Sequence, residues 1–459
     1  MRAWAIGVCL LLPACIELGV YRCAGGRSCE GGTCEPTGYC SYEDEACPSG
    51  RRYSELAAGA LARACVDDEM SSSGSESGTS EAICGNGVGE GDEQCDDGDD
   101  IDGNGCNVDC RESGSVLWTA TFPGAVPGRD TGYAVVMLGS GDVVVGGSEQ
   151  VAGFDDALLM RLRADDGGEV WSWRRATELE ERIEALAINA VGEIVAGGIA
   201  IVPEETDTAW MAVLDGGGAL LYEDHPAGEI VRGVVGNAGG FIVGGGVQAE
   251  DYDGFVASYP EGTQEPFWSV GSALAGDENY VDIERIEANV VFAIVSVADG
   301  AEIHRVDMDG VEVVGSVDAS ILPQGSAFHD PSGGIAIAGY EVTTFANDAW
   351  LGLVGPDGGA VWSVRERDVE LEVDEEFEDV AVDAEGNVIA AGFRTGDDKD
   401  AWVRKYDAAG RLLWTRRFEE PGASVARAVD VDGEGNIAIT GEIDGEDGTL
   451  DFWVAKLLP

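Results

Sequence analysis

A segment of about 50 residues recurs seven times after Ser115, and this repetition limits the folds open to the chain. Each copy is marked by an apolar stretch that ends in glycine, a pattern typical of a short buried strand. Six copies carry this mark: DVVVGGS from Asp142, EIVAGGI from Glu193, GFIVGGG from Gly240, GIAIAGY from Gly334, NVIAAGF from Asn387 and NIAITGE from Asn436. The other copy, around Val290 to Ser296, lacks the glycines, but the spacing on either side of it fits two periods.

Two further marks recur in the same order. One is a strand with a large apolar residue, at Leu158, Trp210, Phe255, Ile303, Trp350, Trp402 and Trp453. The other is a glycine turn that leads into a strand, at Trp171, Tyr222, Trp268, Val314, Trp362 and Trp414. The missing copy of this last strand is SVLWTATF around Trp118, upstream of all the repeats. We therefore expect the N-terminal strand to complete the sheet whose other three strands end at Pro459.

A fourth apolar stretch precedes each glycine-ended strand, as in YAVVML from Tyr133, so each unit has four strands. Four-stranded units at a period of about 40–50 residues are typical of a β-propeller, because a ring of packed sheets buries faces that a lone unit would expose. The sequence predicts an all-β fold with a seven-bladed propeller over 112–459, closed non-covalently by its N-terminal strand. The aromatic marks are interpreted as packing between blades.

The runs KYDAAGRLLW from Lys405 and GPDGGAVW from Gly355 resemble the tryptophan-docking repeats of the pyrroloquinoline-quinone-like propeller superfamily. The resemblance covers residues 115–459, although these copies lack the threonine that usually precedes the glycine. It implies the scaffold. The propeller has no vicinal cysteine pair of the kind found in the dehydrogenases of that superfamily, and we expect no quinone cofactor.

The first residues, MRAWAIGVCLLLPAC, combine one arginine, an apolar run too short to span a bilayer and a small residue before cysteine. LPAC resembles a bacterial lipobox, which implies a signal peptide over 1–14 and lipidation of Cys15. The alternative is an ordinary secretory signal or a short buried segment. No later stretch is long and apolar enough for a transmembrane helix, so we expect the protein to be attached to the membrane through its lipid alone.

Ten further cysteines lie between the leader and the propeller, and they form two even groups separated by a Ser-, Gly- and acid-rich linker over 67–83. Segments this small need covalent staples in place of an apolar core, which favours disulfides and an extracytoplasmic compartment. Zinc is the alternative, but the close C-x-x-C pairs or histidines that it needs are absent. The pairing stays open. The groups are Cys23, Cys29, Cys34, Cys40, Cys47 and Cys65 within 15–66, and Cys84, Cys95, Cys106 and Cys110 within 84–111.

The run CGNGVGEGDEQCDDGDDIDGNGCNVDC from Cys84 closely resembles the Myxococcus-type cysteine-rich repeat of myxobacterial surface and secreted proteins. The segment GYCSYEDEACPSGRRY from Gly38 resembles a second cysteine-rich segment of lipoproteins from the same group. Together they imply a bacterial envelope lipoprotein, in the outer membrane or at the cell surface. The resemblance implies no chemistry.

A net charge of −60 argues against nucleic acid and anionic lipid surfaces as partners, because both would be repelled. Within the cysteine-rich repeat, Asp100, Asp102, Asn104 and Gly105 match the opening of a calcium loop. The twelfth position is Arg111, where a bidentate glutamate is required. A disulfide-braced acidic turn is therefore the alternative to a calcium site.

Catalytic signatures are absent from the sequence, which has no G-x-S-x-G elbow, no H-E-x-x-H and no P-loop. The three histidines, His225, His304 and His329, fall in different repeats without shared spacing. Carboxylates are too abundant for any pair to be singled out as acid and base. We expect a binding protein and not an enzyme.

The loops indicate where binding would occur. Turns between first and second strands and between third and fourth strands are short and glycine-rich, whereas the remaining loops are longer, irregular and acidic. Variable loops on one rigid face commonly carry recognition. We expect partner binding on this face, with a candidate cluster of Glu375, Glu376, Glu378 and Asp379.

The sequence thus favours a lipid-anchored surface protein that recognises an envelope or extracellular protein, peptide or glycan. One alternative is an envelope-assembly scaffold, resembling the lipoprotein propeller that assists insertion of outer-membrane β-barrels. A further alternative is a quinone-dependent or hydrolytic enzyme.

Overall fold

The chain divides into two compact units, Met1–Glu112 and Ser113–Pro459. The computed structural model describes residues 84–459 apart from gaps at 92, 125, 152, 204, 238–239, 249–251, 273–278, 298–299, 368–372, 397, 420–421 and 446–447. In the first 83 residues it describes 29, 32–34, 39–44, 47, 50–54 and 63–66. The predicted signal peptide, Cys15 and the linker over 67–83 lie outside the described residues. No helix among the described residues is long and apolar enough to cross a membrane.

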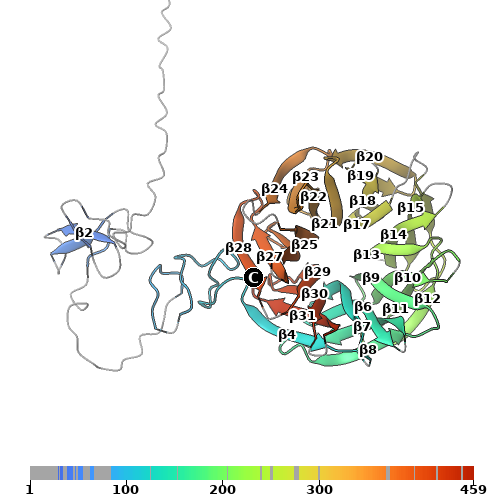
Figure 1. Cartoon of the computed structure of the whole chain (residues 1–459). Helices are drawn as coiled ribbons and strands as arrows, with labels where there is room; N and C mark the ends of the chain where they lie inside the picture. Colours follow the sequence, from blue (N-terminus) through green and yellow to red (C-terminus); the bar gives the residue numbers. More distant parts are fainter. Residues whose placement is uncertain are drawn as a thin grey trace, which may run out of the picture. The chain divides into compact units, whose positions relative to one another are not determined.

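The second unit is a ring of seven four-stranded antiparallel sheets, which confirms the predicted propeller (Figure 1). Blade 1 contains β5 (Thr131–Met137), β6 (Val143–Val151), β7 (Phe154–Leu162) and β8 (Glu169–Arg175). Blade 2 contains β9 (Glu180–Ile188), β10 (Ile194–Ile201), β11 (Thr208–Leu214) and β12 (Leu220–Asp224). Blade 3 contains β13 (Ile230–Asn237), β14 (Gly240–Gln248), β15 (Tyr252–Pro260) and β16 (Trp268–Gly271). Blade 4 contains β17 (Asn279–Glu287), β18 (Val290–Val297), β19 (Gly300–Asp307) and β20 (Gly310–Val317). Blade 5 contains β21 (Ile321–His329), β22 (Gly334–Val342), β23 (Asn347–Val354) and β24 (Ala360–Glu366). Blade 6 is β25 (Glu375–Val382), β26 (Val388–Thr395), β27 (Lys399–Tyr406) and β28 (Leu412–Phe418).

Blade 7 is built from both ends of the unit, as the sequence predicts. It contains β29 (Ser424–Val431), β30 (Ile437–Asp444), β31 (Leu450–Leu457) and, as its outermost strand, β4 (Val116–Phe122). Trp118 lies opposite Lys456 in this register, and Figure 1 shows β4 alongside β31. The copy without glycines also forms a blade, with β18 in second place. The ring is therefore closed by hydrogen bonds between chain segments more than 300 residues apart.

The core of the propeller is divided into seven clusters of buried apolar side chains, one between each pair of neighbouring blades. The large residues of the third strands are buried in them, and Trp402 is fully covered. This confirms the interpretation of these residues as packing between blades. Because each sheet is covered on both faces by its neighbours, burial holds the blades in the ring.

Outer-strand tryptophans dock on the next blade. The Trp118 indole donates to the Ala164 carbonyl at 3.0 Å, and the Trp362 indole donates to the Ala408 carbonyl at 3.0 Å. The face of Trp362 covers Gly410, where a Cβ would lie 2.8 Å from the ring and φ is +78°. Only glycine meets both conditions without strain. Gly167 and Gly218 are covered by Trp118 and Trp171 in the same way, so a glycine turn at these positions is the docking surface for the tryptophan of the preceding blade.

The first unit contains a three-stranded sheet of β1 (Thr33–Cys34), β2 (Cys40–Glu43) and β3 (Arg51–Tyr53). Its described cysteines pair as Cys29–Cys40 and Cys47–Cys65, and those of the cysteine-rich repeat pair as Cys84–Cys110 and Cys95–Cys106. Cys23 and the side chain of Cys34 lie outside the described residues. Four disulfides in segments with little apolar core indicate an oxidising, extracytoplasmic compartment.

Candidate functional site

The innermost strand of every blade carries a β-bulge, which adds one residue to the strand. Bulges re-aim a side chain relative to the regular pleat. The seven added residues line one cavity of about 370 Å³ at the centre of the propeller. We call them the bulge ring: Tyr133, Glu184, Arg232, Val281, Gln324, Glu378 and Arg427. The fold therefore delivers one side chain from each blade to a single site.

Glycine on the second strand makes room for the bulge. A Cβ on Gly147 would lie 1.9 Å from the Thr131 carbonyl oxygen of blade 1, and a Cβ on Gly441 would lie 1.9 Å from that of Val425 in blade 7. The glycine-ended strands of the sequence are thus the local signal for the bulges. Blade 4 carries Val295 at this position and still has the bulge.

The bulge ring opens toward the face that carries the irregular loops. Gln324 and Glu378 are each the fourth residue of their strand, β21 and β25, so the bulge lies in the N-terminal half. The N-terminal ends of the inner strands follow the crossovers between blades. The irregular loops indicate this face in the sequence, but no sequence pattern noted there indicates the bulge ring beneath them.

One side of the bulge ring is neutralised within the protein. Arg427 donates to Glu442 at 2.8 Å and lies 3.8 Å from Glu378, and Arg182 is paired with Glu184. Burial disfavours the charge of Arg427, but the two glutamates outweigh it and raise its pKa. The Tyr133 ring lies between the two guanidinium groups, at 5.7 Å from that of Arg427 and 5.8 Å from that of Arg182.

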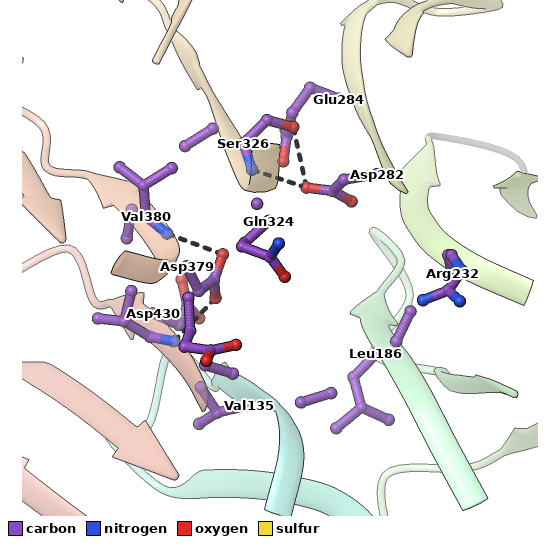
Figure 2. Close-up of a pocket in the computed structure, with 18 of the residues that line it drawn as sticks. Val135, Leu186, Arg232, Asp282, Glu284, Gln324, Ser326, Asp379, Val380 and Asp430 are labelled. Atoms are coloured by element: carbon purple, nitrogen blue, oxygen red, sulfur yellow. Dashed lines mark hydrogen bonds between the residues drawn. The ribbon is translucent and has the colours of Figure 1, made fainter. Parts of the chain in front are cut away.

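Three members of the bulge ring keep their polar groups unused. Arg232 forms no ion pair or hydrogen bond with any described residue, and its Nε is buried. The Gln324 amide and the Tyr133 hydroxyl likewise have no hydrogen-bond partner among the described residues. Figure 2 shows Gln324 turned into the cavity and Arg232 across it from Asp379 and Asp430. Polar groups that face one cavity without a partner in the described part of the protein are suited to bind a ligand.

Four carboxyl groups line the cavity beyond the bulge ring: Asp282, Glu284, Asp379 and Asp430. They connect neighbouring blades (Figure 2). Asp282 accepts from the Ser326 N–H at 3.0 Å and from the Ser326 hydroxyl at 2.9 Å. Asp379 accepts from the Val429 N–H at 2.9 Å. These bonds tie blade 4 to blade 5 and blade 6 to blade 7, so the carboxyl groups have a structural role.

The pKa values of the same four carboxyl groups are raised, so their ionised forms are disfavoured. Burial raises the pKa of Asp282 to about 6, although bonds from Ser326 and Ile283 oppose the shift. Burial also raises the pKa of Asp430 to about 6, against a bond from the Met137 N–H. For Glu284 and Asp379, burial and the charges of the neighbouring carboxylates raise the pKa further. Among the described residues, the cavity therefore combines a guanidinium without an ion-pair partner with four carboxyl groups that form no ion pair.

The four acidic residues expected on the partner-binding face do not form one surface cluster. Glu375 is 4% exposed and pairs with Arg394 at 2.9 Å, and Glu376 accepts from the Asn347 amide at 2.7 Å. Glu378 and Asp379 line the cavity. Neighbouring residues of a strand point to opposite faces, and the bulge turns Glu378 toward the axis. The role of the four residues in partner binding stays a prediction. Glu378 and Asp379 could take part only from within the cavity.

The candidate calcium residues use part of their bonding capacity within the turn. Asp102 accepts from the Val108 N–H at 2.7 Å, and the Asn104 amide donates to Asp99 at 3.1 Å, while Asp100 is exposed. In the described part of the chain, the one group of acidic, His and Cys side chains close enough to share an ion is Cys84, Glu93 and Cys110. Its cysteines form a disulfide and offer no thiolate. Calcium binding stays a prediction.

The histidines serve the scaffold. The His304 ring is fully buried and contacts Tyr280, and the His329 ring contacts Ser332 and the Gly386 carbonyl. His225 contacts the Ala209 carbonyl. His304 lies in blade 4, His329 lies in blade 5 and His225 directly follows blade 2. None of them lines the described cavity.

No protein-family model and no curated protein matches the chain. Solved structures match over most of its length. Sqt1 of Chaetomium thermophilum, bound to the N-terminus of ribosomal protein L10, is 14% identical, with a TM-score of 0.44 over 72% of this chain and 85% of that one. Quinohemoprotein alcohol dehydrogenase of Comamonas testosteroni is 10% identical, with a TM-score of 0.43 over 75% of this chain and 76% of that one. Hydrazine synthase of Kuenenia stuttgartiensis is 11% identical, with a TM-score of 0.48 over 72% of this chain and 96% of that one. Likeness at this level carries no argument about function. The chain is a seven-bladed β-propeller protein with a disulfide-rich N-terminal part.

Proposed function

We propose that this chain is a lipid-anchored envelope protein whose propeller recognises a protein, peptide or glycan at the mouth of its central cavity. The observation that supports this proposal is the bulge ring, in which Tyr133, Arg232 and Gln324 present unused polar groups on the face of the irregular loops. A scaffold alone needs no guanidinium without an ion-pair partner at its centre, and the buried Nε of Arg232 has no hydrogen bond to a described residue. Binding without catalysis accounts for the site with the fewest assumptions.

Capture from envelope extract by the immobilised full chain tests this proposal. We expect Arg232→Gln to reduce the captured partner at least tenfold, the loss that follows removal of a charge-assisted hydrogen bond worth about 1.5–3 kcal/mol. Arg163→Gln is the matched control, because Arg163 is exposed and pairs with Asp166 on a turn of blade 1. Equal capture by the two variants would refute recognition at the cavity.

The anchor is tested on the intact cell. Cys15→Ala should move the protein from the membrane fraction to the soluble fraction, because it removes the proposed acyl chains. External protease should digest the propeller on intact cells if it is displayed at the surface. Full protection of a propeller that becomes digestible after the outer membrane is permeabilised would favour the envelope-assembly scaffold instead.

A hydrolytic enzyme is a second candidate, because the fold brings together carboxyl groups that the sequence could not pair. Glu284 lies in the cavity with its pKa raised by burial and by Asp282 and Asp379, a condition that suits a general acid. Release of reducing sugar from envelope polysaccharide by the purified protein, lost in Glu284→Gln, would establish this function. Absence of release from polysaccharide that the protein binds would exclude it.

A further inference from the structure

We infer that the central cavity binds a small zwitterion, a ligand that carries an ammonium group and a carboxylate, such as a free amino acid. This inference rests on the proposed function, since it names the ligand class of the same site. It follows from the arrangement of two kinds of group in one cavity: a guanidinium without an ion-pair partner among the described residues, Arg232 on blade 3, and carboxyl groups without a cation among them, on blades 4, 6 and 7.

Arg232 lines the cavity without an ion-pair partner among the described residues. The chain has 27 Lys and Arg against 87 Asp and Glu, so most cationic side chains find an acidic partner. Arg427 and Arg182, which lie beside the same ring, are both paired. Arg232 is not paired with any described residue, and Asp282 of the adjacent strand binds Ser326 instead. A guanidinium presents a planar fork of donors that matches a carboxylate, so Arg232 is placed to receive one.

The four carboxyl groups of the cavity form what we call the carboxyl wall: Asp282, Glu284, Asp379 and Asp430. Asp282 and Asp379 directly follow the bulge residues of their strands, Val281 and Glu378. Each accepts backbone N–H groups, but a carboxylate has about four lone-pair sites, and capacity for further donors remains. None of the four carboxyl groups forms an ion pair with a described Lys or Arg. An ammonium group would supply the cation that these carboxyl groups lack and would offset the burial, and for Glu284 and Asp379 also the repulsion, that raises their pKa values.

A ligand with only one of these charges fits the cavity poorly. An anion at Arg232 would face the carboxyl wall, and a cation at the wall would leave Arg232 unpaired. The cavity, at about 370 Å³, lies at the small end of the range for small-molecule sites, which is about 300–1,000 Å³. Gln324 and the Tyr133 hydroxyl are available for the remaining polar groups of the ligand.

The test uses the full chain and the 20 free L-amino acids, each at 10 mM, followed by calorimetry on those that raise the melting temperature. We expect at least one to bind. Its N-acetyl derivative, which lacks the ammonium group, and its amide, which lacks the carboxylate, should each bind at least tenfold more weakly. Arg232→Gln should weaken the parent amino acid about ten- to hundredfold and leave the amide within about twofold, whereas Arg163→Gln should change neither.

Three results would overturn the inference. In the first, none of the amino acids binds. In the second, the parent amino acid and its two derivatives bind with equal affinity. In the third, Arg232→Gln weakens the binding of the parent and of its amide by the same factor. The failure of the broader function is a separate outcome. If no amino acid binds but Arg232→Gln still loses the envelope partner, the ligand class is wrong and recognition at the cavity stands.

Discussion

Neutralising one carboxyl group of the cavity should stabilise the propeller at alkaline pH. Asp430 lies in the inner strand of blade 7, and burial raises its pKa from the usual 3.8 to about 6. A carboxyl group whose pKa is higher in the folded protein than in the unfolded chain favours folding only while it is protonated. Its stabilising contribution is complete below about pH 3.8 and is lost as the pH rises through about 6.

The magnitude follows from the difference between the two pKa values. Each pKa unit corresponds to about 1.4 kcal/mol, so ionisation of Asp430 at pH 8 costs about 3 kcal/mol relative to acid. In Asp430→Asn the side-chain oxygen can still accept from the Met137 N–H, which Asp430 now binds at 2.7 Å, and the side chain never ionises. We expect the variant to match the wild type near pH 4 and to be more stable by about 1–3 kcal/mol at pH 8.

The assay is urea denaturation at pH 4.5 and pH 8, followed by tryptophan fluorescence. All the tryptophans except Trp4 lie in the propeller, so the signal reports on this unit. Asp330→Asn, on an exposed turn of blade 5, removes the same charge and controls for the overall repulsion of the acidic chain. If Asp430→Asn gains no more stability at pH 8 than Asp330→Asn does, ionisation of the buried Asp430 carboxyl group does not destabilise the propeller.

Three further predictions concern the scaffold. Trp118→Ala should lower the free energy of unfolding by about 3–5 kcal/mol in urea, because it empties a buried site at the ring closure, whereas Leu117→Ala on the exposed side of β4 should cost under about 1 kcal/mol. Gly441→Ala should destabilise the propeller in the same assay because of the clash at the bulge, and Gly433→Ala, with open space around it, should not. Peptide mapping without reduction should recover the pairs Cys29–Cys40, Cys47–Cys65, Cys84–Cys110 and Cys95–Cys106, and any other pairing would contradict the structure of the first unit.

The scaffold could be predicted because its signals are local and repeated. Glycine turns, buried strands and large residues return at a fixed period, and the displaced Trp118 strand identifies the closure. Even the copy without glycines keeps the spacing that places it as blade 4. Repetition makes each weak signal count seven times, which is why the sequence alone predicts the ring.

The site could not be predicted in the same way, because it is made of the residues that break the repetition. Tyr133, Arg232 and Gln324 occupy one structural position but share no chemical type. The acidic run from Glu375 appears continuous in the sequence, yet strand alternation and the bulge send Glu375 to an ion pair and Glu378 to the cavity. The signal that could have located the ring is the glycine-ended strand, since it marks the bulge opposite.

Photocrosslinking from the mouth of the cavity can show whether the partner binds at the bulge ring. A photoreactive phenylalanine derivative in place of Gln324, activated in the presence of envelope extract, should form a covalent adduct with the captured partner. The same derivative in place of Val361, exposed on the outer strand β24 of the same blade, should form none. Adducts from position 361 alone would show that the partner binds the rim of the propeller and that the bulge ring is not its binding site.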